Sequence, residues 1–159
     1  MGTIHCKREF ESMSKEDKKE TQGALTMDLW QRGELLAMAA ELMPRATAEG
    51  GAAGKRLGEF ERHYTELAFR VASGIGELHH DWADTFFILQ GGAEIVTGGA
   101  LVGPHTVAPG EERGTAITGA ARRRVAAGDV VHIPAGLPHQ MILGQGETIC
   151  YFVLKIQQK

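Results

Sequence analysis

Apolar and polar residues alternate with a period of two along most of the chain after residue 62. Between residues 63 and 73, for example, Leu67, Phe69 and Val71 alternate with Ala68 and Arg70. Successive side chains of a strand point to opposite faces, so this pattern predicts a half-buried strand. Similar short patterns predict strands at 76–80, 85–90, 93–97, 115–118, 122–126, 130–133, 140–143 and 148–156. Eight or nine short strands with glycine-rich turns and no helix between them predict an antiparallel barrel or sandwich.

A helical pattern precedes these strands. We expect Asp28 to cap the helix, with Gln31 three residues on completing a capping box, and Pro44 to end it. Four apolar residues recur at helical spacing and would share one side of the helix: Leu29, Leu36, Ala40 and Met43. We expect this helix to pack on the outside of the barrel or on a partner subunit.

The patterns divide the chain into three parts. Residues 1–25 are polar and charged, and we expect a flexible tail. Residues 26–58 hold the helix, followed by an Ala- and Gly-rich stretch at 45–58 that is typical of a linker. Residues 59–159 form the β-barrel domain. Within it, residues 101–114 contain two prolines and three glycines, and we expect a long loop between the two halves of the barrel.

Composition narrows the class of protein. The 159 residues suit one domain with a modest appendage, and an apolar content of 43% can build a real core. The formal net charge of -3 gives no sign of a nucleic-acid-binding surface. Cys6 and Cys150 lie far apart, which argues against a disulfide framework, and we expect Cys150 to be a small buried apolar side chain. No stretch is apolar enough to span a membrane or to resemble a signal peptide, so we expect a cytoplasmic protein.

Candidate chemistry is concentrated in two histidine-containing regions. Glu77 and His79 are two residues apart on a predicted strand and therefore share a face, and Asp84 follows a short turn from which it can reach the same pocket. A histidine with two carboxylates suits Mn, Fe, Ni or Zn rather than a metal that prefers thiolates. His139 follows a Pro-Ala-Gly-Leu-Pro turn at the start of a predicted strand, and it can add a second imidazole.

Both regions resemble the conserved motifs of the cupin superfamily. The second family motif is Gly, five residues, Pro-x-Gly, two residues and His, and Gly128, Pro134, Gly136 and His139 match it. In the first motif a carboxylate residue is followed by six residues and a glycine, as Asp84 is followed by Gly91. The resemblance covers roughly residues 63–156. It implies an all-β cupin fold, a double-stranded β-helix or jelly-roll barrel, here with a short N-terminal helical extension.

The first motif departs from the family pattern. Its usual Glu is Asp84 here, and its His-x-His pair is broken. If four residues separate the pair from Asp84, Glu77 and His79 take the two His positions. If three residues separate them, Leu78 and His80 take these positions, and one ligand is lost because leucine cannot bind a metal. We favour the first alignment because it places two donors on one strand face, and we keep His80 as a reserve ligand.

The resemblance implies a metal-binding cupin. We expect a divalent metal ion (Mn, Fe, Ni or Zn) held by four residues inside the barrel: Glu77, His79, Asp84 and His139. We expect an apolar pocket lining from Phe86, Ile88, Met141 and Leu143. The implied activity is that of a small-molecule metalloenzyme of dioxygenase, lyase, decarboxylase or isomerase type. We also expect a homodimer, and we expect no binding to nucleic acid or membrane.

Two alternatives remain open. One is a non-catalytic module that binds a small ligand in the same pocket, with or without metal. The other is a purely structural or storage barrel, which we favour least because buried histidine and carboxylate groups cost stability when nothing pairs with them.

Overall fold

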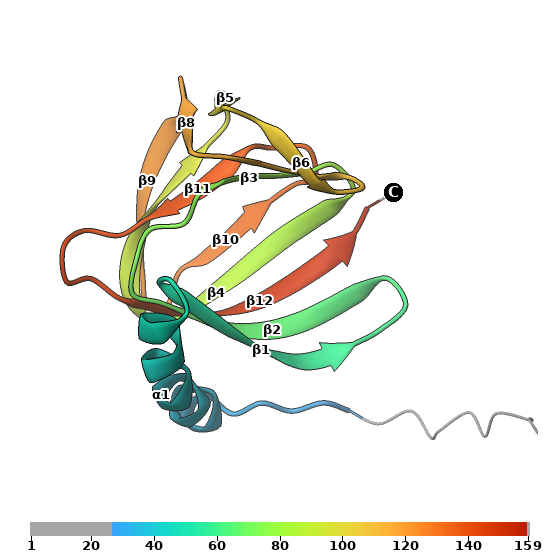
Figure 1. Ribbon diagram of the computed structural model, residues 1–159. Helices are drawn as coiled ribbons and strands as arrows, with labels where there is room; N and C mark the ends of the chain where they lie inside the picture. Colours follow the sequence, from blue (N-terminus) through green and yellow to red (C-terminus); the bar gives the residue numbers. More distant parts are fainter. Residues whose placement is uncertain (1–26, 159) are drawn as a thin grey trace, which may run out of the picture.

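A computed structural model describes residues 27–158 of the chain (Figure 1). The tail expected at residues 1–25, with Cys6, lies outside the described residues. The described part contains one helix, α1 (Arg32–Ala48), and twelve strands. The strands are β1 (Ala52–Glu59), β2 (His63–Arg70), β3 (Gly76–His79), β4 (Trp82–Thr97), β5 (Ala100–Val102), β6 (His105–Ala108), β7 (Glu111–Gly114), β8 (Ala116–Thr118), β9 (Ala121–Ala126), β10 (Val130–Ile133), β11 (His139–Ile142) and β12 (Ile149–Gln157).

The strands curl into an antiparallel barrel, as the period-two pattern predicts. Ten strands form one sheet with the order β1-β2-β12-β4-β11-β3-β7-β6, and β9 and β10 pair with β4. The strand β4 joins the two sides of the barrel, because its first half pairs with β12 and β10 and its second half with β9 and β11. The two halves were predicted as separate strands. They join at Gly91, whose φ of 74° favours glycine and lets the backbone bend toward Thr148.

The helix is present, but its start, end and buried face differ from the prediction. Gln31, not Asp28, is the N-cap residue, and the Glu34 carboxylate accepts a hydrogen bond of 3.2 Å from the Gln31 backbone N–H. Pro44 lies inside the helix on its exposed face, where water can bind the carbonyl that proline leaves unpaired. Within residues 27–158, no helix is long and apolar enough to cross a membrane.

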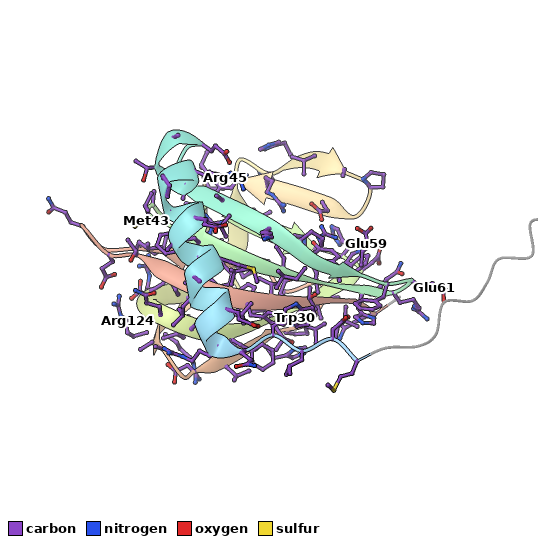
Figure 2. All side chains as sticks on the ribbon, turned by 90° about the horizontal axis from the view of Figure 1, so that it is seen from below. Trp30, Met43, Arg45, Glu59, Glu61 and Arg124 are labelled. Carbon is purple, nitrogen blue, oxygen red and sulfur yellow. The ribbon has the colours of Figure 1, made fainter. Side chains whose placement is uncertain are left out.

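The buried face of α1 lies next to the predicted one. Leu35, Ala39, Leu42 and Ala46 are buried against β1 and β2, whereas Leu29 and Met43 are exposed. The apolar residues of this segment form two offset stripes, and periodicity alone does not tell which one the sheet covers. Figure 2 shows the helix lying across the outer surface of the sheet, with Trp30 at its N-terminal end and Met43 and Arg45 further along.

Two segments predicted as irregular are ordered in strands. The linker expected at 45–58 instead contains the last turn of α1 and the edge strand β1, which pairs with β2 from Ala52↔Arg70 onward. The long loop expected at 101–114 contains β5, β6 and β7, and β7 pairs with β3. Both segments are rich in small or polar residues and show no apolar pattern, so main-chain pairing with a neighbouring strand decides their structure.

Alternate residues of the same strands build two separate apolar cores. The core inside the barrel is lined by side chains such as Phe86, Ile95 and Met141. The second lies between the sheet and α1, and it contains Leu67 and Cys150. Cys150 is fully buried there, as expected, and burial raises the pKa of its thiol to about 11. Because the outer face of the sheet is covered by a helix, the inner face is free to carry polar residues.

Candidate metal centre

Four side chains from three strands meet inside one end of the barrel. Glu77 and His79 project from β3, two residues apart and therefore on one face. His139 is the first residue of β11 and pairs with Glu77 in the antiparallel register, which places the two side chains next to each other. Asp84 comes from β4 and lies opposite Ile133 of β10 and Lys155 of β12. Residues far apart in the sequence are thus brought together by strand pairing.

The distances between the four side chains are those of a compact polar cluster. The Nε2 atom of His139 lies 3.4 Å from Asp84 Oδ2 and 3.8 Å from Glu77 Oε2. The Nε2 atom of His79 lies 3.5 Å from Asp84 Oδ2 and 3.4 Å from Glu77 Oε2. One donor atom from each of Glu77, His79 and His139 lies within 4.8 Å of the others, a spacing that can hold a metal ion.

The orientation of His139 leaves a lone pair pointing into the cluster. Its Nδ1 atom lies 3.1 Å from the carbonyl oxygen of Leu137, so Nδ1 carries the proton and donates it. In the neutral ring Nε2 is then an acceptor, and the groups nearest to it are the carboxylates of Asp84 and Glu77, which also accept. Among the described residues, this buried Nε2 has no hydrogen-bond partner. Acceptors that converge on one point need a proton or a metal cation between them, and the cluster can supply the site for either.

Lys155 is the functional residue of this cluster that the sequence analysis missed. Its Nζ atom lies 2.8 Å from His79 Nε2 and 3.2 Å from Asp84 Oδ1. The signal in the sequence is a lysine that follows Tyr151 and Val153 at alternate positions of an otherwise apolar strand. Since both of those side chains face the interior, Lys155 must face it too.

Glu111 also approaches the cluster, from the segment that was expected to be a loop. Its Oε1 atom lies 3.3 Å from His79 Nδ1, and its other carboxylate oxygen accepts a hydrogen bond of 3.2 Å from Arg113. The sequence offers no signal for this contact, because it depends on the pairing of β7 with β3.

Electrostatics keep both carboxylates of the cluster ionised. Burial alone would raise the pKa of Glu77, but the contact with His79 and the charge of Arg113 outweigh it and lower the pKa to about 2. Burial opposes ionisation of Asp84 as well, and its contact with His139 and the ammonium group of Lys155 lower its pKa in spite of it. At neutral pH the cluster therefore offers the charged oxygen donors that a divalent metal prefers.

His80, the reserve ligand, lies outside the cluster. Its side chain is 48% exposed, and its Nε2 atom lies 2.8 Å from Glu112 Oε1 on the surface. The structure thus brings together Glu77, His79, Asp84 and His139, and leaves the alternative pair of Leu78 and His80 away from them.

The four residues expected to line the pocket lie in two different places. Phe86 and Met141 line cavities beside the cluster, whereas Ile88 and Leu143 pack in the apolar core of the barrel. Apart from Phe86, the larger cavity, of about 190 Å³, is lined mainly by polar and charged residues rather than apolar ones. Three of them project from alternate positions of β2: Tyr64, Glu66 and Arg70.

Comparison with known proteins rests on structure alone. No family model matches the sequence, and no curated protein matches it. Among solved structures, TT1209 from Thermus thermophilus matches with a TM-score of 0.56 and 15% identity, over 84% of this chain and 100% of that one. The Cnp3 cupin domain of Schizosaccharomyces pombe matches with a TM-score of 0.51 and 14% identity, over 67% of this chain and 64% of that one. The chain has the cupin fold.

A third match agrees with this assignment. A protein from Klebsiella pneumoniae with a double-stranded β-helix domain has a TM-score of 0.51 and 14% identity, over 69% of this chain and 80% of that one. The expected double-stranded β-helix with a helical extension is therefore confirmed. At these identities the similarity establishes the fold, and the chain spans less than two thirds of the solved Schizosaccharomyces pombe chain. Function has to be argued from the residues of the site.

Proposed function

We propose that this cupin barrel binds one divalent metal ion and acts on a small molecule as a metalloenzyme. Glu77, His79 and His139 would hold the ion, with Asp84 as a further donor, and Mn, Fe, Ni and Zn all suit such a mixture of imidazole and carboxylate. One observation carries the proposal: the buried Nε2 lone pair of His139 faces two ionised carboxylates and has no hydrogen-bond donor among the described residues.

The surrounding residues support such a site. The Leu137 carbonyl fixes the tautomer and the orientation of the His139 ring, as an outer-sphere partner of a metal ligand does. When bound, the ion would supply Lewis-acid chemistry by polarising a substrate oxygen. The Lys155 ammonium group, beside Asp84, can donate a proton or a hydrogen bond to a substrate in the adjoining cavity. Phe86 and Val153 contribute an apolar part to the lining of the same space.

This arrangement suits the dioxygenase, lyase, decarboxylase and isomerase classes, all of which depend on a polarised oxygen or an activated small molecule in a confined pocket. The chain's own contribution is to place a proton donor, Lys155, and two imidazoles around the same point.

A second candidate function is a non-catalytic module that binds a small ligand without metal. The observation in its favour is that the Lys155 ammonium group already lies between His79 and Asp84. This cation partly satisfies the acceptors of the cluster. Metal binding requires the contact between Lys155 Nζ and His79 Nε2 to break, because the imidazole has one lone pair to give.

Metal analysis separates the two candidates. We expect the protein purified from medium supplemented with Mn, Fe, Ni and Zn to carry close to one metal ion per chain, and His79→Ala and His139→Ala to lose it. His80→Ala is the matched control, because this neighbouring histidine is paired with Glu112 on the surface, and its metal content should equal that of the wild type. A wild-type protein that stays free of metal in every medium would favour the metal-free module.

We also expect a homodimer. Phe87 and Val130 are exposed apolar residues on the outer surface, and a shallow apolar depression lies between Trp30 and Phe152. Sedimentation equilibrium tests the expectation directly, and a mass of 17.2 kDa at all concentrations would contradict it.

A further inference from the structure

The cavity of about 190 Å³ beside the cluster has an unusual distribution of charge. Three carboxylates line it, from Glu66, Glu77 and Asp84, together with two cationic groups, from Arg70 and Lys155. The lining therefore carries one net negative charge as long as no metal is present. A divalent ion at the cluster changes this to one net positive charge. The cavity would then attract an anion with a single charge.

Arg70 is the group best placed to receive that anion. Its Nε–H donates a hydrogen bond of 3.1 Å to the hydroxyl oxygen of Tyr151, a buried residue of β12. Among residues 27–158 this is the only hydrogen bond of the guanidinium, so the Nη groups, which lie against Gly74 at the edge of the cavity, have no other hydrogen-bond partner. The planar fork of a guanidinium matches the two oxygens of a carboxylate. Tyr151 holds the fork in place, which lowers the entropic cost of binding.

The carboxylates near Arg70 are shared with other cationic groups, although the charge of Glu77 also acts on Arg70. Glu66 lies 3.6 Å from Arg56, which partly compensates its charge from outside the cavity. Glu77 lies 4.0 Å from Arg113 and 3.4 Å from His79. The charge of Arg70 is thus available to a bound molecule.

We propose that the cavity binds a small monocarboxylic acid, with its carboxylate on the Nη groups of Arg70 and its remaining polar group directed toward Asp84 and Lys155. The inference rests on the proposed metal site, because the ion makes the cavity positive. A dry cavity of ~150 Å³ accommodates a molecule of about the size of benzene. The volume of the cavity therefore matches a short-chain or single-ring acid.

The experiment is isothermal titration of the Zn²⁺-loaded protein with lactate and with its neutral amide, lactamide. Zinc does not change its redox state, so the titration reports binding alone. We expect lactate to bind about tenfold or more tightly than lactamide, as is typical of a hydrogen-bonded charged pair. Removing the metal should weaken lactate binding, because the cavity then becomes negative. Equal affinity for lactate and lactamide, or no heat with lactate at all, would overturn the inference.

Substitutions of Arg70 test whether its guanidinium causes the preference for lactate over lactamide. Arg70→Gln should abolish the difference between lactate and lactamide while the zinc content stays at one per chain. Arg123→Gln is the matched control, because Arg123 is exposed on β9 outside the cavity, and it should behave as the wild type. A preference that survives in folded Arg70→Gln would contradict the role of Arg70. Circular dichroism checks folding, and Arg70→Lys, which keeps the charge but loses the fork, should retain a reduced preference.

The outcomes distinguish this inference from the proposal on which it rests. A protein that binds zinc stoichiometrically but does not prefer lactate refutes the carboxylate site and leaves the metal centre intact. A protein that binds no zinc refutes both. Equal affinity of the wild-type protein for lactate and lactamide overturns the inference even if every Arg70 variant fails to fold. A preference for lactate is assigned to Arg70 by the variants, because a carboxylate can also bind the zinc ion directly.

Discussion

The two faces of strand β2 meet opposite surroundings. Leu67 and Phe69 point outward and are buried beneath α1, whereas Glu66 and Arg70 point inward and line a cavity. In a barrel without a cover, the apolar residues would have to face the interior. Here a helix covers the outer face of β2, so the apolar burial of this strand lies outside the barrel and its inner face can hold charges. The comparison teaches that stability and chemistry are divided between the two faces of the same strand.

The largest effect on the free energy of unfolding should follow from removing buried apolar contacts on the outer face of β2. Leu67 is fully buried between the sheet and the helix. Leu67→Ala should lower the free energy of unfolding by about 3 kcal/mol, through lost burial and the cavity that remains. Glu66→Gln, its neighbour on the inner face, should change the same quantity by less than about 1 kcal/mol. Urea unfolding measures both, and equal losses would show that the two faces contribute alike.

A smaller effect should follow from acidifying the inner face of the metal-free protein. The pKa of Glu77 is lowered from its ordinary value of 4.5 to about 2 in the folded state. A lowered pKa contributes stability that is complete above pH ~4.5 and is lost as the pH falls toward ~2.

Wild-type protein should therefore lose about 2 kcal/mol more stability than Glu77→Gln between pH 6 and pH 2.5. Urea unfolding at a series of pH values gives this difference. Parallel curves for the two proteins would show that Glu77 has the same pKa in the folded and the unfolded chain.

Removing the charge of Lys155 tests whether this side chain competes with a metal ion for His79. Its Nζ atom occupies the lone pair of His79 that a metal needs. Lys155→Met keeps an unbranched side chain of similar length, one atom shorter, and removes the competing, repelling charge, so zinc should bind about tenfold more tightly. Competition with a fluorescent chelator measures the affinity. Weaker zinc binding in the variant would mean that Lys155 supports the metal site rather than competing with it.

The smallest effect on the free energy of unfolding is expected for an exposed ion pair that lies on neither face of β2. The guanidinium of Arg122 lies 2.6 Å from the carboxylate of Glu94, and both side chains are substantially exposed. Arg122→Ala should change the free energy of unfolding by less than about 0.5 kcal/mol, because exposed ion pairs contribute little. A loss of more than ~1 kcal/mol would show that the outer surface of β9 contributes to stability in a way that its exposure does not suggest.

Much of the barrel could be predicted from local patterns. The strand β10 (Val130–Ile133) coincides with its predicted range, and the Gly128 to His139 motif indicated the correct fold. The linker at 45–58 and the loop at 101–114 were wrong, because β1 and β7 are edge segments whose structure depends on partners distant in sequence. The predicted buried face of α1 was wrong because the helix carries two offset apolar stripes, and the sequence does not tell which one packs against the sheet.

The candidate site shows the same limit. Glu77, His79, Asp84 and His139 could be selected because their spacing follows from strand geometry and from the cupin motifs. Lys155, in spite of its alternation with Tyr151 and Val153, and Arg70 were missed, because a charged residue in an alternating strand is normally assigned to the solvent side. Their inward direction depends on the helix that covers the opposite face, and no local pattern reveals that cover.

The central claim is that the cluster inside the barrel holds a metal ion. Anomalous diffraction at the zinc edge from zinc-loaded crystals tests it most directly. The account predicts one peak at about 2.0–2.2 Å from donor atoms of Glu77, His79 and His139, the usual length of such bonds. It also predicts that Lys155 Nζ has left His79 Nε2. A map without a peak there, with Lys155 still in contact with His79, would contradict the claim.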